Sequence, residues 1–435
     1  MTKEFREVRK DLSGPAAAPY IGPAREMLGE LKQSMKLNDL KILSKTVDLP
    51  NGVRVMVQSV FGQDKISILA PTVSPEKTIL PVEEALRPSD IVIVGRADNQ
   101  AVRWVNGVIH GLGVLPGYAY SVATDVSANG RVVVGYSFNS TTAGILKSSN
   151  IHQSQAFAWT PTTGMIGLGW LAAPPGQEET RFFESLATGV SYDGKVIVGS
   201  DTVSVNNVDG FRWTGTSFAQ LGSIDPDFEV IYVATGVNSD GDVIVGYDWY
   251  NGFQTQAFMW TPAAGTVGLG FIKGQKFNRY STAYAVSGNG KVVVGYGYNL
   301  SSTDENGSPP QAFRWTAVDG MIGLGPLAGY AESYAQGVSR DGNVIAGYGW
   351  TGPGSEACIW TPKKGMRGIG FLPNTAFSFA QSVSSDGTIL VGSSYNNTVD
   401  GSDSEAFIWS QGQGMTGLGF LKGGVNSFAN AVTII

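Results

Sequence analysis

The sequence repeats one unit seven times between residues 89 and 435. Its clearest marker is a tryptophan, and successive copies stand 45 to 55 residues apart. Each tryptophan is preceded by an apolar run that ends in glycine, such as IVIVG or VVVG, and is followed by Gly-Leu-Gly or a close variant. A chain of this kind folds by packing one repeat on the next. The seven tryptophans are Trp104, Trp159, Trp213, Trp260, Trp315, Trp360 and Trp409.

Each unit contains four short strands. The first two are joined, in six units, by an Asn-Gly or Asp-Gly pair, which predicts a hairpin with a type I′ turn and positive φ at both positions. The second strand is apolar at consecutive positions (Val132, Val133 and Val134 in one copy), which indicates that both of its faces are buried. Four antiparallel strands per ~50 residues, seven times over, predict an all-β fold that is a seven-bladed β-propeller.

The two ends of the repeated region complement each other. The first unit has no first strand and begins directly at Ser89 with SDIVIVG. The chain ends with ANAVTI and then Ile435, which repeats the beginning of a first strand and stops there. We therefore expect the C-terminal strand to complete the first blade and to close the propeller.

Composition changes near residue 88. Residues 1–88 carry 24 charged residues and 5 glycines, whereas residues 89–435 carry 42 and 53. The first segment, 1–88, is expected to be a small N-terminal α/β arm or docking module, and 89–435 the propeller. Pro23 followed by helically spaced Met27, Leu28, Leu31 and Met35 predicts a helix over 22–36. Alternating patterns after it predict short strands and a hairpin.

Several classes of site are disfavoured by composition. The chain has 30 basic and 36 acidic residues, so it has no basic footprint for nucleic acid. Its single cysteine, Cys358, stands where sister units have Phe, and its two histidines are unpaired: His110 is expected in a turn between the third and fourth strands, and His152 in a long loop. We expect no metal site, no cofactor, no membrane span and no catalytic residues, and therefore no enzymatic activity.

The connections after the second strand are long and variable, and a pattern of aromatic residues marks where they begin. Five units have an aromatic residue three positions after the second-strand glycine, and Asn follows in three of them. Flat apolar rings beside amides suit a sugar-binding surface, and the alternative is that the rings pack between neighbouring units. The candidate ligand-binding residues are Phe138, Asn139, Trp249, Tyr298, Asn299, Trp350, Tyr395 and Asn396.

The repeat, with its elements AFxW, GLG, A-VS-DG and VxVGY, resembles the HAF repeats of many bacterial proteins predicted to be extracellular. The resemblance covers roughly residues 90–435, and residues 1–88 resemble no family. One difference is consistent, because the His of HAF is replaced here by Gln155, Gln256, Gln311, Glu356 or Glu405. The resemblance implies export, although the chain opens with no secretory signal, and it implies no set of catalytic residues.

Two functions remain open, both non-catalytic. In the first, the chain is a bacteriophage virion (tail) component, whose residues 1–88 dock to other virion proteins or to further copies of itself, and whose propeller presents its loop-rich face. The missing signal favours this hypothesis, because phage particles leave the cell by lysis. In the second, the chain is an exported bacterial surface or secreted lectin-like protein that binds cell-surface glycan. A glycan lyase or hydrolase is a third class, for which the sequence offers no catalytic constellation.

Overall fold

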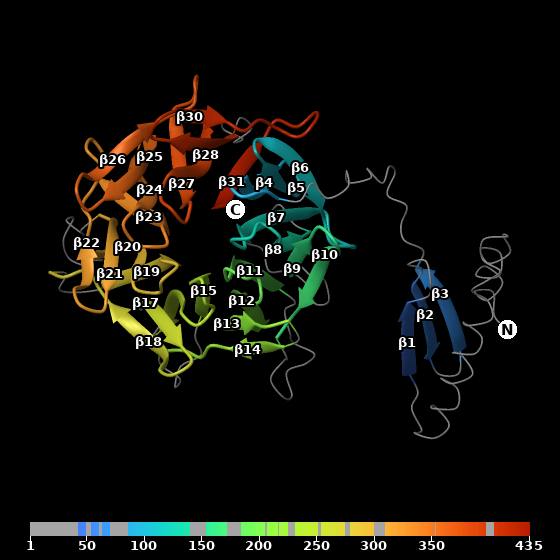
Figure 1. Cartoon of the computed structure of the whole chain (residues 1–435). Coiled ribbons are helices and arrows are strands. Elements are labelled where there is room, and N and C mark those ends of the chain that lie inside the picture. The colour runs from blue at the N-terminus through green and yellow to red at the C-terminus, as the bar shows by residue number, and fades with distance from the viewer. Residues whose placement is uncertain are drawn as a thin grey trace. The chain divides into compact units, whose positions relative to one another are not determined.

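The computed structural model divides the chain into two compact units, Met1–Glu84 and Ala85–Ile435. Within the described residues there is no helix, and the second unit is a ring of β-sheets (Figure 1). No helix in the described part of the chain is therefore long and apolar enough to cross a membrane. The described residues are 42–48, 54–60, 63–69, 86–139, 154–171, 184–204, 207–215, 217–224, 231–250, 254–274, 279–299, 309–352, 354–396 and 404–435.

The first unit contains a three-stranded antiparallel meander. Its strands are β1 (Ile42–Asp48), β2 (Arg54–Val60) and β3 (Gln63–Leu69), and β2 is the central strand. The short strands predicted for this segment are therefore present. The helix predicted over 22–36 lies outside the described residues.

In the second unit the strands form successive antiparallel groups of four. The groups are β31 (Ser427–Ile434), β4 (Ile91–Ala97), β5 (Gln100–Val105), β6 (Val108–Gly113); β7 (Tyr120–Val126), β8 (Val133–Phe138), β9 (Ser154–Thr160), β10 (Gly164–Gly169); β11 (Glu184–Val190), β12 (Ile197–Ser204), β13 (Asn207–Trp213), β14 (Phe218–Gln220); β15 (Ile231–Val237), β16 (Ile244–Tyr250), β17 (Gln254–Thr261), β18 (Gly265–Gly270); β19 (Arg279–Val286), β20 (Val293–Asn299), β21 (Gln311–Thr316), β22 (Gly320–Gly323); β23 (Glu332–Val338), β24 (Ile345–Thr351), β25 (Gly354–Thr361), β26 (Gly365–Gly370); and β27 (Phe377–Val383), β28 (Ile389–Tyr395), β29 (Glu405–Ser410), β30 (Gly414–Gly417).

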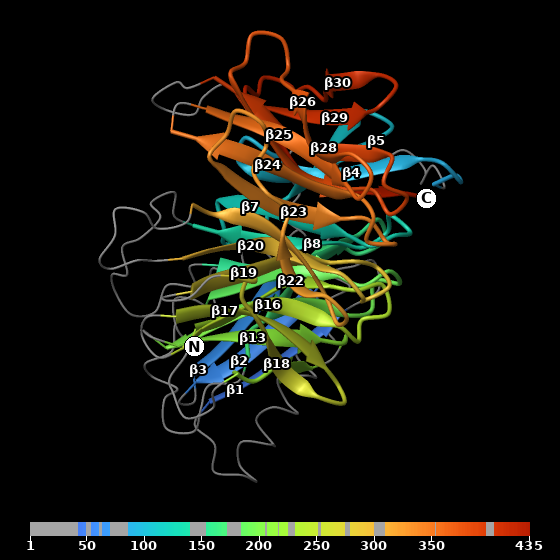
Figure 2. The ribbon, with the colours of Figure 1, turned by 90° about the vertical axis from the view of Figure 1, so that its left-hand side faces the viewer.

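The first strand of each group lies nearest the middle of the ring, and the fourth lies at the outside (Figure 1). We call β7, β11, β15, β19, β23, β27 and β31 the inner strands. Figure 2 shows the same ring from its side. β31, at the C-terminal end, pairs with β4, from Ser427 opposite Ala97 to Ile434 opposite Ile91. The all-β, propeller-like architecture predicted from the repeats is confirmed.

The glycine that ends each apolar run has a steric role. At Gly295 a methyl group would overlap the main-chain carbonyl oxygen of Thr282 on the paired inner strand, and the same overlap occurs in the other six groups. The inner strand carries a bulge at this point, between Ala283 and Ala285. The bulge brings the two backbones together, and only glycine leaves room for it.

The Gly-Leu-Gly-type segment packs against the Gln or Glu that stands directly before the alanine of the third strand. The Glu356 side chain lies over Gly368, where a Cβ would overlap its carboxylate, and its Oε1 accepts a hydrogen bond from the N–H of Gly370 at 3.1 Å. Gly370 has φ +81°, a conformation that favours glycine. Gln100 and Glu405 make the equivalent bond in their groups.

The turns between the first and second strands differ from the type I′ prediction, which was wrong. In one copy the N–H of Gly130 donates to the carbonyl of Ser127 at 2.8 Å, and Gly130 has φ +66°. Asn129 does not adopt positive φ, which among the described non-glycine residues is confined to Ser89, Asp98, Asn106 and Asn374. The Asn129 side chain instead accepts from the Ser127 hydroxyl and the Arg131 N–H, which stabilises a wider turn.

In six of the seven groups a buried serine on the inner strand joins the group to the one before it. The Ser333 hydroxyl accepts from the N–H of Ala312 at 3.0 Å and donates to the carbonyl of Gly325 at 2.8 Å. The same two bonds are made by the equivalent serines of five other groups, which are Ser121, Ser185, Ser281, Ser378 and Ser427. On β15 the serine is replaced by Tyr232, and Gly210 replaces the alanine, so that the larger ring is accommodated.

Candidate functional site

The inner strands direct every second side chain toward the middle of the ring. On β23, Ser333, Ala335 and Gly337 are buried within the sheets, whereas Tyr334 and Gln336 are half-buried. This alternation follows from the two-residue period of a strand. The ring therefore has an inner surface whose residues come from all of the described four-stranded groups.

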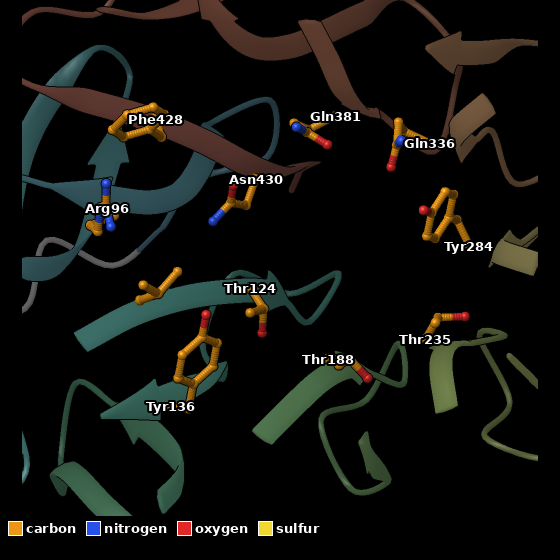
Figure 3. Close-up of a pocket in the computed structure, with 11 residues that line it drawn as sticks. Arg96, Thr124, Tyr136, Thr188, Thr235, Tyr284, Gln336, Gln381, Phe428 and Asn430 are labelled. Carbon is orange, nitrogen blue, oxygen red and sulfur yellow. The ribbon is translucent and has the colours of Figure 1, made fainter. Parts of the chain in front are cut away.

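These side chains line a cavity of about 480 Å³ (Figure 3). One lining residue per inner strand stands directly after the buried alanine of that strand, and every one is polar. They are Thr124, Thr188, Thr235, Tyr284, Gln336, Gln381 and Asn430. The remaining lining residues are Arg96, Val122, Tyr136 and Phe428. The cavity thus combines a ring of neutral polar groups with aromatic surface and one cation.

Part of this polar ring joins neighbouring groups. The Thr124 hydroxyl donates to the carbonyl of Ala187 at 2.8 Å, and Thr188 and Thr235 make the same bond to the next inner strand at 2.9 Å. The Asn430 amide completes the series by donating to the carbonyl of Ala123 at 2.8 Å. These four side chains stabilise the ring.

A continuous series of aromatic rings lies along the inner surface beside the polar ring. The rings belong to residues of β19–β20, β23–β24 and β27–β28, and the centroids of neighbouring rings are 4.4 to 6.3 Å apart. We call this series the aromatic arc: Tyr280, Tyr284, Tyr296, Tyr298, Tyr334, Tyr348, Trp350, Phe377, Phe379 and Tyr395. Stacked and edge-to-face rings at these distances stabilise one another and present flat apolar surface.

Three phenols of the arc, those of Tyr296, Tyr334 and Tyr348, remain protonated at neutral pH. Burial raises the pKa of Tyr296, Tyr334 and Tyr348 above the usual value near 10. The carboxylate of Glu332 adds to the rise at Tyr334, because its Oε2 accepts a hydrogen bond from the Tyr334 hydroxyl at 2.6 Å. The arc therefore offers O–H groups as well as ring faces.

The aromatic residues singled out from the sequence lie beside or within this surface. Phe138 stacks on Tyr120 at 5.2 Å on the β7–β8 hairpin. Tyr298, Trp350 and Tyr395 belong to the arc, where each contacts another ring. Trp249 is 46 % exposed, and no other ring of the described residues contacts it. Four of the five rings are thus supported by neighbours, and Trp249 has its face in solvent.

The predicted amides are not part of one cluster. Asn139 accepts from the N–H of Ala119 at 3.0 Å and donates to the carbonyl of Gly117 at 3.1 Å, so it braces a connection. Asn396 is half-buried at the end of β28. The side chain of Asn299 lies outside the described residues.

The isolated candidates for chemistry lie apart from the cavity. Cys358 is buried, and burial raises the pKa of its thiol well above the usual range. His110 lies in strand β6 opposite Arg103, not in the turn where it was expected, because the turn closes earlier, at Asn106 and Gly107. Burial and then the Arg103 charge lower the pKa of His110. His152 lies outside the described residues.

The polar ring and Arg96 were missed in the sequence. The residue after the inner-strand alanine is Thr, Tyr, Gln or Asn, so its identity varies from copy to copy. A comparison by residue class would have found it, since it is polar in all seven copies.

A second cavity of about 710 Å³ lies where the first-to-second-strand turns are. Trp315, Val292 and Met259 contribute apolar surface to it, and Lys291 and Asp341 contribute charge. Its residues come from a few neighbouring elements, whereas the central cavity is built from every inner strand.

No protein-family model matches the chain, and no curated protein matches it in sequence. Among solved structures, TolB from Acinetobacter baumannii is 10 % identical, with a TM-score of 0.40, over 76 % of this chain and 79 % of that one. The β-propeller domain of the Trilobed protease from Pyrococcus furiosus is 10 % identical, with a TM-score of 0.41, over 87 % and 95 %. A structure from an analysis of two prolyl endopeptidases is 12 % identical, with a TM-score of 0.49, over 93 % of this chain and 55 % of that one. TM-scores below 0.5 at these identities support no conclusion about the activity of the chain.

Proposed function

We propose that the ring is a seven-bladed β-propeller, closed by β31 as the inner strand of the first blade, and that its blades are repeats of the HAF type. The support is the repetition of the tryptophan unit and the pairing of seven residues of β31, between Ser427 and Ile434, with β4. Such a closure holds the two ends of the ring together and keeps the inner surface rigid.

On this scaffold we propose a non-catalytic function, the binding of a saccharide at the central opening. The observation that carries the proposal is the aromatic arc beside the polar ring. Saccharides present flat C–H faces and a rim of hydroxyls, and the arc presents ring faces, phenolic donors and neighbouring amides. A cavity of about 480 Å³ is within the size range of small-molecule sites.

The test is a glycan array with the full-length chain, followed by calorimetry with the best ligand. Replacing Trp350, a residue of the arc, by Ala removes one aromatic contact of about 0.5–1.5 kcal/mol, so affinity should fall roughly two- to tenfold. Tyr192→Ala is the matched control, because Tyr192 is 48 % exposed but lies in a turn at the opposite ends of the strands. Equal losses in Trp350→Ala and Tyr192→Ala, or no glycan binding by the parent chain, would contradict the proposal.

The cellular setting stays a prediction from the sequence. A virion component that docks through residues 1–88 and an exported surface or secreted protein are both compatible with a saccharide-binding propeller. Analytical ultracentrifugation of the full chain distinguishes them in part, because the docking hypothesis expects defined oligomers that change when charged residues of 1–88 are replaced.

A further inference from the structure

We propose that the saccharide bound in the central cavity is acidic, and that Arg96 recognises its carboxylate. This inference rests on the proposed saccharide binding and adds the class of ligand. It is carried by the charge in the cavity and by which of its polar side chains are already engaged.

Arg96 is the one charged side chain among the eleven that line the cavity. It is half-buried on β4, and its guanidinium lies over the ring of Phe428, 4.8 Å from the centroid. No carboxylate of the described residues pairs with it, and Glu332, which is bonded to Tyr334 of the arc, does not line the cavity. A partly desolvated cation without a counter-charge favours an anion from solution.

The donors of the cavity fall into two sets. The first set is already engaged in hydrogen bonds. Main-chain carbonyls accept from Thr124, Thr188, Thr235 and Asn430, and the side chain of Gln336 is hydrogen-bonded to Tyr348. Three side-chain donors make no hydrogen bond to any described residue: the guanidinium of Arg96, the hydroxyl of Tyr136 and the amide of Gln381.

These three donors lie on successive parts of the ring. Gln381 is on β27, Arg96 is on β4 beside β31, and Tyr136 is on β8 (Figure 3). Arg96 and Tyr136 line the same cavity, where burial raises the pKa of the Tyr136 phenol and the Arg96 charge opposes the rise. A guanidinium, a phenol and an amide are together a set of donors, and none of the described residues that line the cavity with them is an acid.

The chemistry favours a carboxylate carried by a sugar over a free ion. A planar carboxylate can accept two parallel hydrogen bonds from a guanidinium. The sugar ring would contact Phe428 and Tyr136, which a free sulfate would leave uncovered. The neutral polar groups that remain would face its hydroxyls.

The experiment measures binding of a matched pair of disaccharides to the full-length chain by calorimetry. One ends in glucuronic acid, the other in glucose, and sodium sulfate serves as the inorganic anion. We expect the acidic disaccharide to bind at least about tenfold more tightly. Arg96→Gln should bring the two affinities together, Arg96→Lys should keep part of the preference, and Arg131→Gln, which removes an exposed arginine in a turn, should keep all of it.

Each outcome has a separate meaning. If both disaccharides bind equally well, saccharide binding stands and the acidic class is wrong. If neither binds, the proposed function fails. If sulfate binds as tightly as the acidic disaccharide, the site takes a free anion and the saccharide assignment is overturned. Thermal unfolding of each variant shows whether it is folded. If Arg96→Gln does not fold, the parent chain's preference for the acidic disaccharide is measured at low and high salt instead. A preference that persists unchanged at high salt would contradict an ionic contact.

Discussion

The buried serine that joins successive groups provides a quantitative test of how the ring is held together. Ser333 is fully buried, and its hydroxyl satisfies the N–H of Ala312, which is itself buried. In Ser333→Ala that N–H loses its partner, which costs about 1–3 kcal/mol, and the bond to the half-buried carbonyl of Gly325 is lost as well, at about 0.5–1 kcal/mol because water can replace it. We expect a total loss of roughly 1.5–4 kcal/mol in the free energy of unfolding.

The assay is urea unfolding of the full chain followed by tryptophan fluorescence. All ten tryptophans lie in residues 89–435, so the signal reports on the ring alone. With an m-value of about 2–3 kcal/mol per molar, the midpoint should fall by about 1 M. Ser185→Ala, at the same position in another group, should give a similar shift.

Ser217→Ala is the matched control, because Ser217 is exposed and its side chain makes no hydrogen bond to another described residue. Its midpoint should correspond to a change within about 0.5 kcal/mol. If Ser333→Ala shifts the midpoint no more than Ser217→Ala does, the serine contacts do not hold the groups together and the reasoning is refuted.

Three further predictions concern the ring. Gly295→Ala should prevent folding or lower the unfolding midpoint severely, because of the overlap with the neighbouring carbonyl, whereas Gly352→Ala meets open space and should be tolerated, as circular dichroism and solubility would show. Burial raises the pKa of Asp125 from 3.8 to about 6, so the native state favours the protonated form of this carboxyl. Ionisation of Asp125 should therefore lower the free energy of unfolding by up to about 3 kcal/mol between pH 4 and pH 7. The urea midpoints of Asp125→Gly at the two pH values should lack this loss, and a loss equal to that of the parent chain would contradict the prediction. Cys358 should react with thiol reagents only after unfolding, and rapid modification of the native chain would argue against its burial.

The sequence predicts the all-β, propeller-like ring because its strongest constraints recur in every copy. The second-strand glycine must be glycine wherever the inner strand bulges, and the apolar run before it is buried on both faces, as at Val133 and Val134. Such requirements are purely local, so they are visible as a repeated pattern.

Other features depend on tertiary contacts and were predicted less well. An Asn-Gly pair fits two kinds of turn, and the side-chain bond between Ser127 and Asn129 selects the wider one. Trp350 and Tyr395 were predicted from spacing, but Phe379, the ring that contacts both of them, lies on a different strand. Arg96 occupies a position that is tyrosine in several other groups, so only the folded ring shows that it is the cation of the cavity.

The central claim is that the opening of the ring binds a saccharide, and a crystal structure of the full chain with its best glycan tests it most directly. We predict ligand density in the cavity beside Arg96, Tyr136 and Gln381, in contact with the aromatic arc. A glycan bound on the outer strands or at the turn face, with the central cavity unchanged, would contradict the claim.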